Sequence, residues 1–235
     1  MNTVAEIEEA VRRLSRRERR RLFDWFAGAL DWDLGVLEPM ATYGSAAERH
    51  ELYSLEQYFE IEARSSIPHE YVAGEIYDMA DPSQDHEIIA MNLAAPLHAH
   101  VQDRPCRIYP GRRQLQFKIG EDDFVYRPDV WVACGEVRNA KGGFVDEPCL
   151  VIEVLSPSTA RFDRREKVAS YREIPSIEEY VLVGQKPAHV VIRRRAQQWK
   201  PQVLESLDSS LDLQSVGLLL PVARIYKGVS AETLP

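Results

Sequence analysis

The stretch Cys149-Leu-Val-Ile-Glu153-Val-Leu155 is an apolar run interrupted by a single carboxylate. A short run of aliphatic and β-branched residues is typical of a buried strand, and Pro157 marks the end of this one. The hydroxyls of Ser156-Pro-Ser-Thr159 are natural N-caps for a helix expected over residues 160–173. A buried strand followed by a helix that packs back across it favours an α/β fold.

Helices and strands alternate on both sides of this unit. Helices are expected at residues 52–63 and 83–101. Because a proline inside a helix costs about 3 kcal/mol, we expect a kink or break at Pro96. Further strands are expected at residues 71–79 (turning at Ala73-Gly74), 107–109, 114–119, 125–133, 180–183, 190–194 and 203–204. These elements predict a mixed β-sheet flanked by helices.

The N-terminal residues 1–48 are predicted to form a helical extension and linker, and residues 49–235 the main domain. Apolar residues recur at helical spacing from Ala5 to Leu14, and Ser15 and Glu18 match a capping box for a second helix. Residues 31–49 contain the Gly, Pro and Asp typical of a linker. Both helices carry many arginines, at positions 12, 13, 16, 17, 19, 20 and 21. These arginines indicate a solvated surface or, alternatively, a docking arm for DNA or a partner.

Composition narrows the class of protein. The 235 residues are enough for one main core, and the net charge of −8 repels a polyanion at long range, so any contact with nucleic acid must be local. The sequence has no apolar run of about 20 residues that could span a bilayer and no signal-peptide core. These two observations predict a cytoplasmic protein with no membrane partner. Three cysteines without a CxxC pair argue against a disulfide framework and a thiolate zinc site.

Two carboxylates interrupt apolar strands. Asp129 lies in Val125-Tyr-Arg-Pro-Asp129-Val-Trp-Val-Ala133, and Glu153 lies among aliphatic residues. An ionised carboxylate is costly to bury without a cation, an arginine or a metal. On neighbouring strands the two could converge on one hard divalent ion. A Pro-Asp pair is also common in turns, so Asp129 alone is equally well explained as structural.

Lys167 lies in the helix expected after Glu153, about two turns from its start. An ammonium at this place could reach the carboxylates, where it would orient or deprotonate a water molecule or stabilise charge on a phosphate. Taken alone, a lysine at this position is more often a solvated helix residue. Two other chemistries are disfavoured: His86, His98 and His100 do not share a helix face for zinc, and neither Ser156 nor Ser158 has a glycine-flanked nucleophile elbow.

Several blocks of sequence together resemble one family. They are His69-Glu70-Tyr71-Val-Ala-Gly74-Glu75-Ile76, His86, Arg127-Pro-Asp129-Val, Leu150-Val-Ile-Glu153-Val-Leu-Ser-Pro-Ser-Thr159, Asp163-Arg-Arg-Glu-Lys167 and Tyr171. This combination resembles the bacterial Uma-two family, which is assigned to the PD-(D/E)XK, or restriction-endonuclease-like, nuclease superfamily. The resemblance covers residues from about Tyr53 to Val183, more than half of the chain.

The resemblance implies a four-stranded mixed sheet and a metal-dependent endonuclease that hydrolyses phosphodiester bonds in nucleic acid, with DNA as the first expectation. It implies Mg²⁺ or Mn²⁺ held by Asp129, Glu153 and the carbonyl of Val154, with Lys167 as the third catalytic residue. The superfamily's lysine two residues after the acid is replaced by Leu155, so its role would pass to Lys167. Supporting residues are Glu70, Glu75 and His86; each glutamate is equally well explained as a surface acid of a hairpin.

Two points stay open at the level of sequence. The family usually carries a tryptophan and an Asp-Pro pair where this chain has Tyr180-Val-Leu-Val-Gly184-Gln185, which affects local geometry rather than the metal ligands. The alternative to an enzyme is a catalytically silent nuclease-fold binding module in a mobile-element or toxin–antitoxin-like assembly. A homodimer is a further expectation, because this superfamily often cuts as dimers.

Overall fold

The structure is a computed structural model that describes residues 3–14, 18, 22, 52–111, 113–135, 147–156, 167–186 and 188–230. The chain divides into two compact units, one of Met1–Asp78 with Gly120–Phe124 and one of Met79–Ile119 with Val125–Pro235. The predicted boundary at residues 48 and 49, the linker and most of the second N-terminal helix lie outside the described residues.

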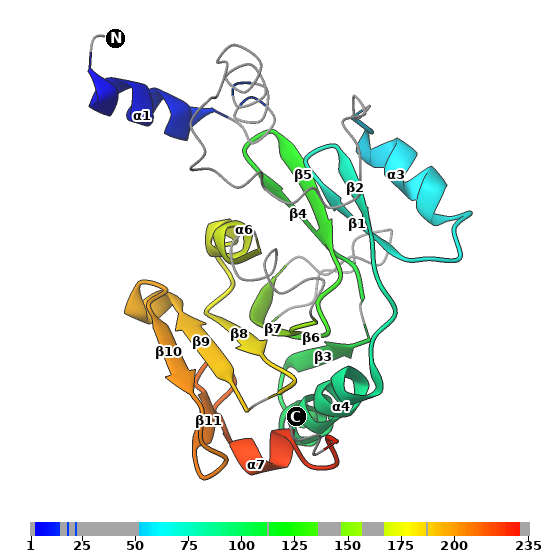
Figure 1. Cartoon of the computed structure of the whole chain (residues 1–235), viewed down its shortest axis with the longest axis vertical. Coiled ribbons are helices and arrows are strands. Elements are labelled where there is room, and N and C mark those ends of the chain that lie inside the picture. The colour runs from blue at the N-terminus through cyan, green and yellow to red at the C-terminus, as the bar shows by residue number, and fades with distance from the viewer. Residues whose placement is uncertain are drawn as a thin grey trace, which may run out of the picture. The chain divides into compact units, whose positions relative to one another are not determined.

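The first unit contains two capped helices and a hairpin (Figure 1). Helices α1 (Val4–Arg13) and α3 (Leu55–Glu62) each begin with a capping box, formed by Thr3 with Glu6 and by Ser54 with Gln57. Strands β1 (His69–Val72) and β2 (Glu75–Asp78) pair in antiparallel fashion. The predicted turn at Ala73-Gly74 is confirmed: both residues have positive φ, 51° and 99°, as a two-residue hairpin turn requires.

The second unit is built on a six-stranded sheet with the order β10-β9-β8-β7-β6-β3 (Figure 1). Its strands are β3 (Cys106–Pro110), β6 (Val130–Cys134), β7 (Pro148–Val154), β8 (Glu179–Val183), β9 (Val190–Arg194), which runs into a 3₁₀ turn η2 (Arg195–Gln197), and β10 (Pro201–Leu204). Among these strands only β7 and β8 run parallel. Every residue of β7 is buried, as expected for a central strand covered on both faces. The mixed α/β fold is confirmed, with six strands in this sheet rather than four.

The prediction of one strand over residues 125–133 was wrong. Strand β4 (Leu115–Ile119) is followed, across a turn at Gly120, by β5 (Asp122–Tyr126), and β6 begins only at Val130. The break falls at Pro128, which has no N–H to donate to a neighbouring strand and has a fixed φ. The interruption leaves Asp129 directly before the first residue of β6.

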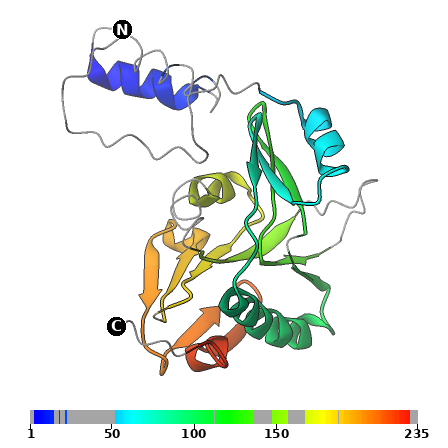
Figure 2. The same cartoon turned by 45° about the vertical axis from the view of Figure 1, so that its right-hand side comes forward.

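Pro96 does not break the helix that contains it, because α4 is one helix over Gln84–Val101. The helix lies beside β3 and the short helix α7 (Val222–Ile225) in both cartoon views (Figures 1 and 2). Leu93 and Leu97, on either side of the proline, are fully buried. Burial of this apolar face offsets the hydrogen bond that Pro96 cannot make. No helix of the described residues is long and apolar enough to cross a membrane.

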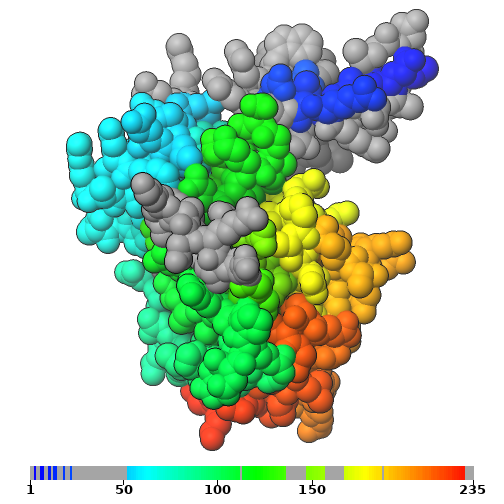
Figure 3. All heavy atoms as spheres, turned by 180° about the vertical axis from the view of Figure 1, so that it is seen from behind, coloured from blue at the N-terminus to red at the C-terminus, as the bar shows by residue number. Residues whose placement is uncertain are grey.

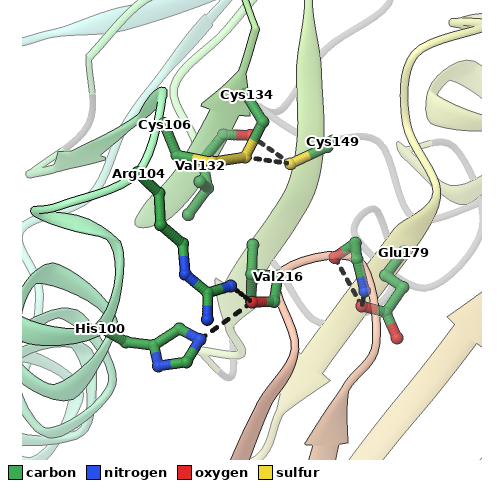
Figure 4. Close-up of a disulfide and its surroundings, with 9 residues drawn as sticks. His100, Arg104, Cys106, Val132, Cys134, Cys149, Glu179 and Val216 are labelled. Carbon is green, nitrogen blue, oxygen red and sulfur yellow. Dashed lines mark hydrogen bonds between the residues drawn. A yellow bond between two sulfur atoms is a disulfide. The ribbon is translucent and has the colours of Figure 1, made fainter.

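The C-terminal hairpin, β11 (Ser210–Leu213) and β12 (Leu218–Pro221), was not predicted from the sequence. Side chains of the second unit hold it in place: the His100 ring and the Arg104 guanidinium both hydrogen bond to the carbonyl of Val216, at 2.9 and 2.7 Å (Figure 4). In the space-filling view, the green spheres of the middle of the chain adjoin the orange and red spheres of this segment (Figure 3).

The structure contains a disulfide, although the cysteine pattern argued against a disulfide framework. Cys106 and Cys134 form a disulfide between β3 and β6, where they are direct partners in the strand register (Figure 4). Pairing across a sheet leaves no spacing motif in the sequence, so the cysteine pattern could not reveal it. Cys149 is a buried thiol, with its Sγ 3.6 Å from that of Cys134. Burial raises the pKa of Cys149 to about 11.

Candidate functional site

Asp129 and Glu153 are brought together by the pairing of β6 with β7. Val130 and Ile152 form the end pair of this antiparallel ladder, so Asp129, directly before Val130, and Glu153, directly after Ile152, lie at the same end of it. Both side chains are buried, with 7% and 4% of the residue exposed. The central strands thus place two carboxylates side by side in a site that water scarcely reaches.

Asp129 is held by two groups from different elements. Its Oδ2 accepts a hydrogen bond of 2.8 Å from the backbone N–H of Val154 and lies 3.1 Å from Nε2 of His86. His86 is itself buried and lies in the first turn of α4, whose N-cap is Ser83. The start of α4 and the end of β7 therefore meet at one carboxylate oxygen.

Glu153 is held from the other side by α6 (Val168–Glu173). The ammonium of Lys167, directly before this helix, lies 2.9 Å from Glu153 Oε1, and the Tyr171 hydroxyl donates to the same oxygen at 3.1 Å. Residues four apart share one helical face. Lys167 is 4% exposed, so the predicted approach of this lysine to Glu153 takes place in the protein interior.

The ring of Tyr126 lies close to the Lys167 ammonium and belongs to a small cluster of aromatic side chains. The ammonium lies 5.4 Å from the ring centroid of Tyr126, within the range of a cation–π contact. The Tyr126 hydroxyl hydrogen bonds to Ser170 at 3.0 Å, and its ring packs edge-on against Tyr171 and Phe117. Sequence reasoning missed Tyr126 and Ser170, since nothing in their spacing connects them to Glu153. The rings lower the local dielectric, which strengthens the attraction between Lys167 and Glu153.

The donor set suits a hard divalent cation. Asp129, Glu153 and the backbone of Val154 offer only oxygen ligands, and Mg²⁺ is typically bound through one or two carboxylates while it keeps several waters. Within the described ranges, no three His, Cys, Asp or Glu side chains form a metal-holding group. The residues fit an ion that the protein shares with water and substrate, rather than a fully enclosed structural metal.

Two of the predicted supporting residues lie in the other compact unit. Glu70 is on β1 and is 6% exposed, and Glu75 is on β2, where its carboxylate accepts a hydrogen bond from the Tyr77 hydroxyl. Their part in the site stays a prediction. His86 does meet Asp129 directly, whereas His100 bonds to the backbone of Val216.

Comparison with known proteins places the chain in a family. The model of the Uma2 family, described as "Putative restriction endonuclease", matches residues 55–223. The chain belongs to the Uma2 family. Two uncharacterised relatives come from Synechocystis sp. (strain ATCC 27184 / PCC 6803 / Kazusa) and are each 33% identical to this chain. Protein slr1290 aligns over 75% of this chain and 93% of its own length, and protein sll1609 over 55% and 73%.

A solved structure supports the same fold. The crystal structure of "a putative nuclease belonging to DUF820" from Anabaena variabilis ATCC 29413 superposes with a TM-score of 0.63 and 18% sequence identity, over 74% of this chain and 97% of that one. At this identity the likeness concerns the fold alone. The resemblance seen in the sequence blocks is confirmed, and this Uma2 protein has a restriction-endonuclease-like, nuclease-type fold.

Proposed function

We propose that this protein is a metal-dependent endonuclease that hydrolyses phosphodiester bonds in DNA with Mg²⁺ or Mn²⁺. The observation that carries the proposal is the pair of buried carboxylates at one end of the β6–β7 ladder, with a buried lysine 2.9 Å from one of them. Membership of a family described as "Putative restriction endonuclease" supports the choice of reaction and of nucleic acid as substrate.

The burial of these charges supports a functional origin. A buried ion pair is often no more stabilising than apolar residues of similar size, because both charges must lose their water. Asp129, Glu153, Lys167 and His86 are all less than 9% exposed, yet they gather at the ends of β7 and α4. Groups of buried titratable residues are more frequent at functional sites than in structural cores.

Each residue has a distinct task in the proposed reaction. Asp129, Glu153 and the carbonyl of Val154 would hold the ion, which when bound lowers the pKa of water and neutralises charge on the phosphate. His86 and the N–H of Val154 orient the Asp129 carboxylate. Lys167 presents a positive charge to the attacking water and the phosphate, held in place by Glu153 and the Tyr126 ring.

The charge of the whole chain limits how nucleic acid can bind. With a net charge of −8, the protein repels a phosphate backbone at long range, so binding must rest on local contacts and on the ion itself. We therefore expect weak binding of DNA when divalent ions are removed, and cleavage that is strongly inhibited by salt.

The test is cleavage of single- and double-stranded DNA and RNA by the purified full chain, with Mg²⁺, Mn²⁺ or EDTA. We expect metal-dependent cutting that Asp129→Asn and Glu153→Gln each reduce about 100-fold or more. Asp208→Asn, a change of an exposed aspartate, serves as the control and should cut like the unmodified protein. Metal binding without cutting of any substrate would refute the enzyme and favour the silent binding module.

A further inference from the structure

Gln185 joins two parts of the candidate site that are far apart in the sequence. It follows β8, and its side-chain amide donates a hydrogen bond of 2.9 Å to the carbonyl of Leu155, directly after β7. Its Oε1 accepts a hydrogen bond of 2.8 Å from the hydroxyl of Ser83, the N-cap of α4. One side chain thus bridges the strand end that carries Glu153 and the helix start that carries His86.

Both hydrogen-bond partners of Gln185, Ser83 and Leu155, are in turn linked to residues of the candidate site. The Ser83 oxygen that donates to Gln185 also accepts the backbone N–H of His86 at 3.2 Å, and His86 lies 3.1 Å from Asp129. At the other end, the N–H of Leu155 is bonded to the carbonyl of Val183 at 2.8 Å. Both backbone groups of Leu155 are therefore fixed by residues 183–185, directly next to the Val154 backbone.

The turn that carries Gln185 is held in place by hydrogen bonds to the Tyr226 hydroxyl. The Tyr226 hydroxyl donates to the carbonyl of Gly184 at 2.8 Å and accepts the N–H of His189 at 3.0 Å. Burial raises the pKa of Tyr226, so the hydroxyl keeps its proton and remains a donor. Lys186 adds a second link to α4 through Asp85, at 2.9 Å.

We propose that Gln185 is a positioning residue of the metal site, which sets the end of β7 against the first turn of α4. The inference rests on the proposed metal-dependent function. An amide is required at this position because it donates to Leu155 and accepts from Ser83 at once, whereas a carboxylate only accepts. With glutamate at 185, the Leu155 carbonyl would face another acceptor, and the Val154 backbone would lose its support next to the ligand carboxylates.

The experiment compares Gln185→Glu and Gln185→Ala with the unmodified chain. Mn²⁺ affinity is measured by calorimetry, the Mg²⁺ concentration for half-maximal cleavage of DNA by titration, and folding by the thermal unfolding midpoint. Gln214→Glu is the matched control, since it makes the same change of charge at an exposed glutamine whose side-chain amide hydrogen bonds to Asp212. Loss of an outer partner of a metal ligand typically weakens metal binding about 10- to 100-fold.

We expect both Gln185 variants to bind Mn²⁺ about 10-fold more weakly and to need correspondingly more Mg²⁺, while the rate at saturating metal changes less. Their unfolding midpoints should stay within about 4 °C of the unmodified chain. Unchanged metal affinity in both variants overturns the inference and leaves the proposed function standing. An unmodified chain that neither binds Mn²⁺ nor cuts with Mg²⁺ overturns the proposed function and, with it, this inference.

Discussion

Replacement of Lys167 by methionine tests the central charge pair of the site. Lys167 and Glu153 are each 4% exposed, and removal of one partner of a buried pair costs about 3–5 kcal/mol because the other charge stays behind. Tyr171 still donates to Glu153, at 3.1 Å, and offsets part of this loss, so we expect the lower value, about 3 kcal/mol. For a chain of this length that corresponds to a midpoint lower by about 6–12 °C.

The assay is urea unfolding in EDTA and again with Mn²⁺, beside cleavage of DNA. In Lys167→Met the ion supplies the missing positive charge, so Mn²⁺ should stabilise the variant more than the unmodified chain. Cleavage should still fall about 100-fold or more, since the charge on the phosphate has lost its partner. Lys200→Met, at an exposed lysine, is the control and should change stability by less than about 0.5 kcal/mol. A loss below about 1 kcal/mol in EDTA would refute the reasoning about the buried pair.

Two further predictions concern the scaffold around the site. Glu179→Gln should destabilise the protein by about 3–5 kcal/mol in urea unfolding, because it leaves the Arg194 guanidinium, 2.6 Å away and 3% exposed, without its counter-charge. The same change at Glu205, whose side chain is 73% exposed, should cost less than about 1 kcal/mol, and equal effects would contradict the argument. Cys149, with its pKa raised to about 11, should react with iodoacetamide at pH 8 about 100-fold more slowly in the folded than in the unfolded chain. The reaction of the folded chain should become faster as the pH rises. Comparable rates for the two states would show that the thiol is not buried.

The sequence predicted the elements that bury their residues in a regular pattern. The run from Cys149 to Leu155 gave the central strand within one residue, and the hairpin turn at Ala73-Gly74 was placed correctly. The same apolar strands also drew attention to Asp129 and Glu153, because a carboxylate inside such a run is out of place. That the two residues lie at the same end of the β6–β7 ladder follows from strand register, which the spacing permitted but did not determine.

The hairpin and the disulfide, which were not predicted from the sequence, depend on residues that are far apart along the chain. The C-terminal hairpin is short, and contacts such as those of Arg104 with Val216 and of Arg194 with the Asp212 carbonyl help to hold it. The disulfide depends on the pairing of β3 with β6. At Pro128 the local pattern was misleading, since apolar residues stand on both sides of Arg127-Pro-Asp129, where the chain leaves one strand and enters the next. For the hairpin and the disulfide the deciding interactions are long-range, and periodicity along the chain does not reveal them.

In the proposed site, Lys167 takes the role that the family resemblance gives to a lysine two residues after the acid. Side chains two residues apart on a strand share a face, so a lysine at position 155 would lie beside Glu153, but this chain has a buried leucine there. The ammonium instead comes from the start of α6 and reaches Glu153 at 2.9 Å. A lysine on the strand would be placed by the strand alone, whereas Lys167 depends on the packing of α6, on Tyr171 and on the Tyr126 ring. Changes at these two tyrosines should therefore act on the site through Lys167 and Glu153, although neither tyrosine needs to touch the substrate.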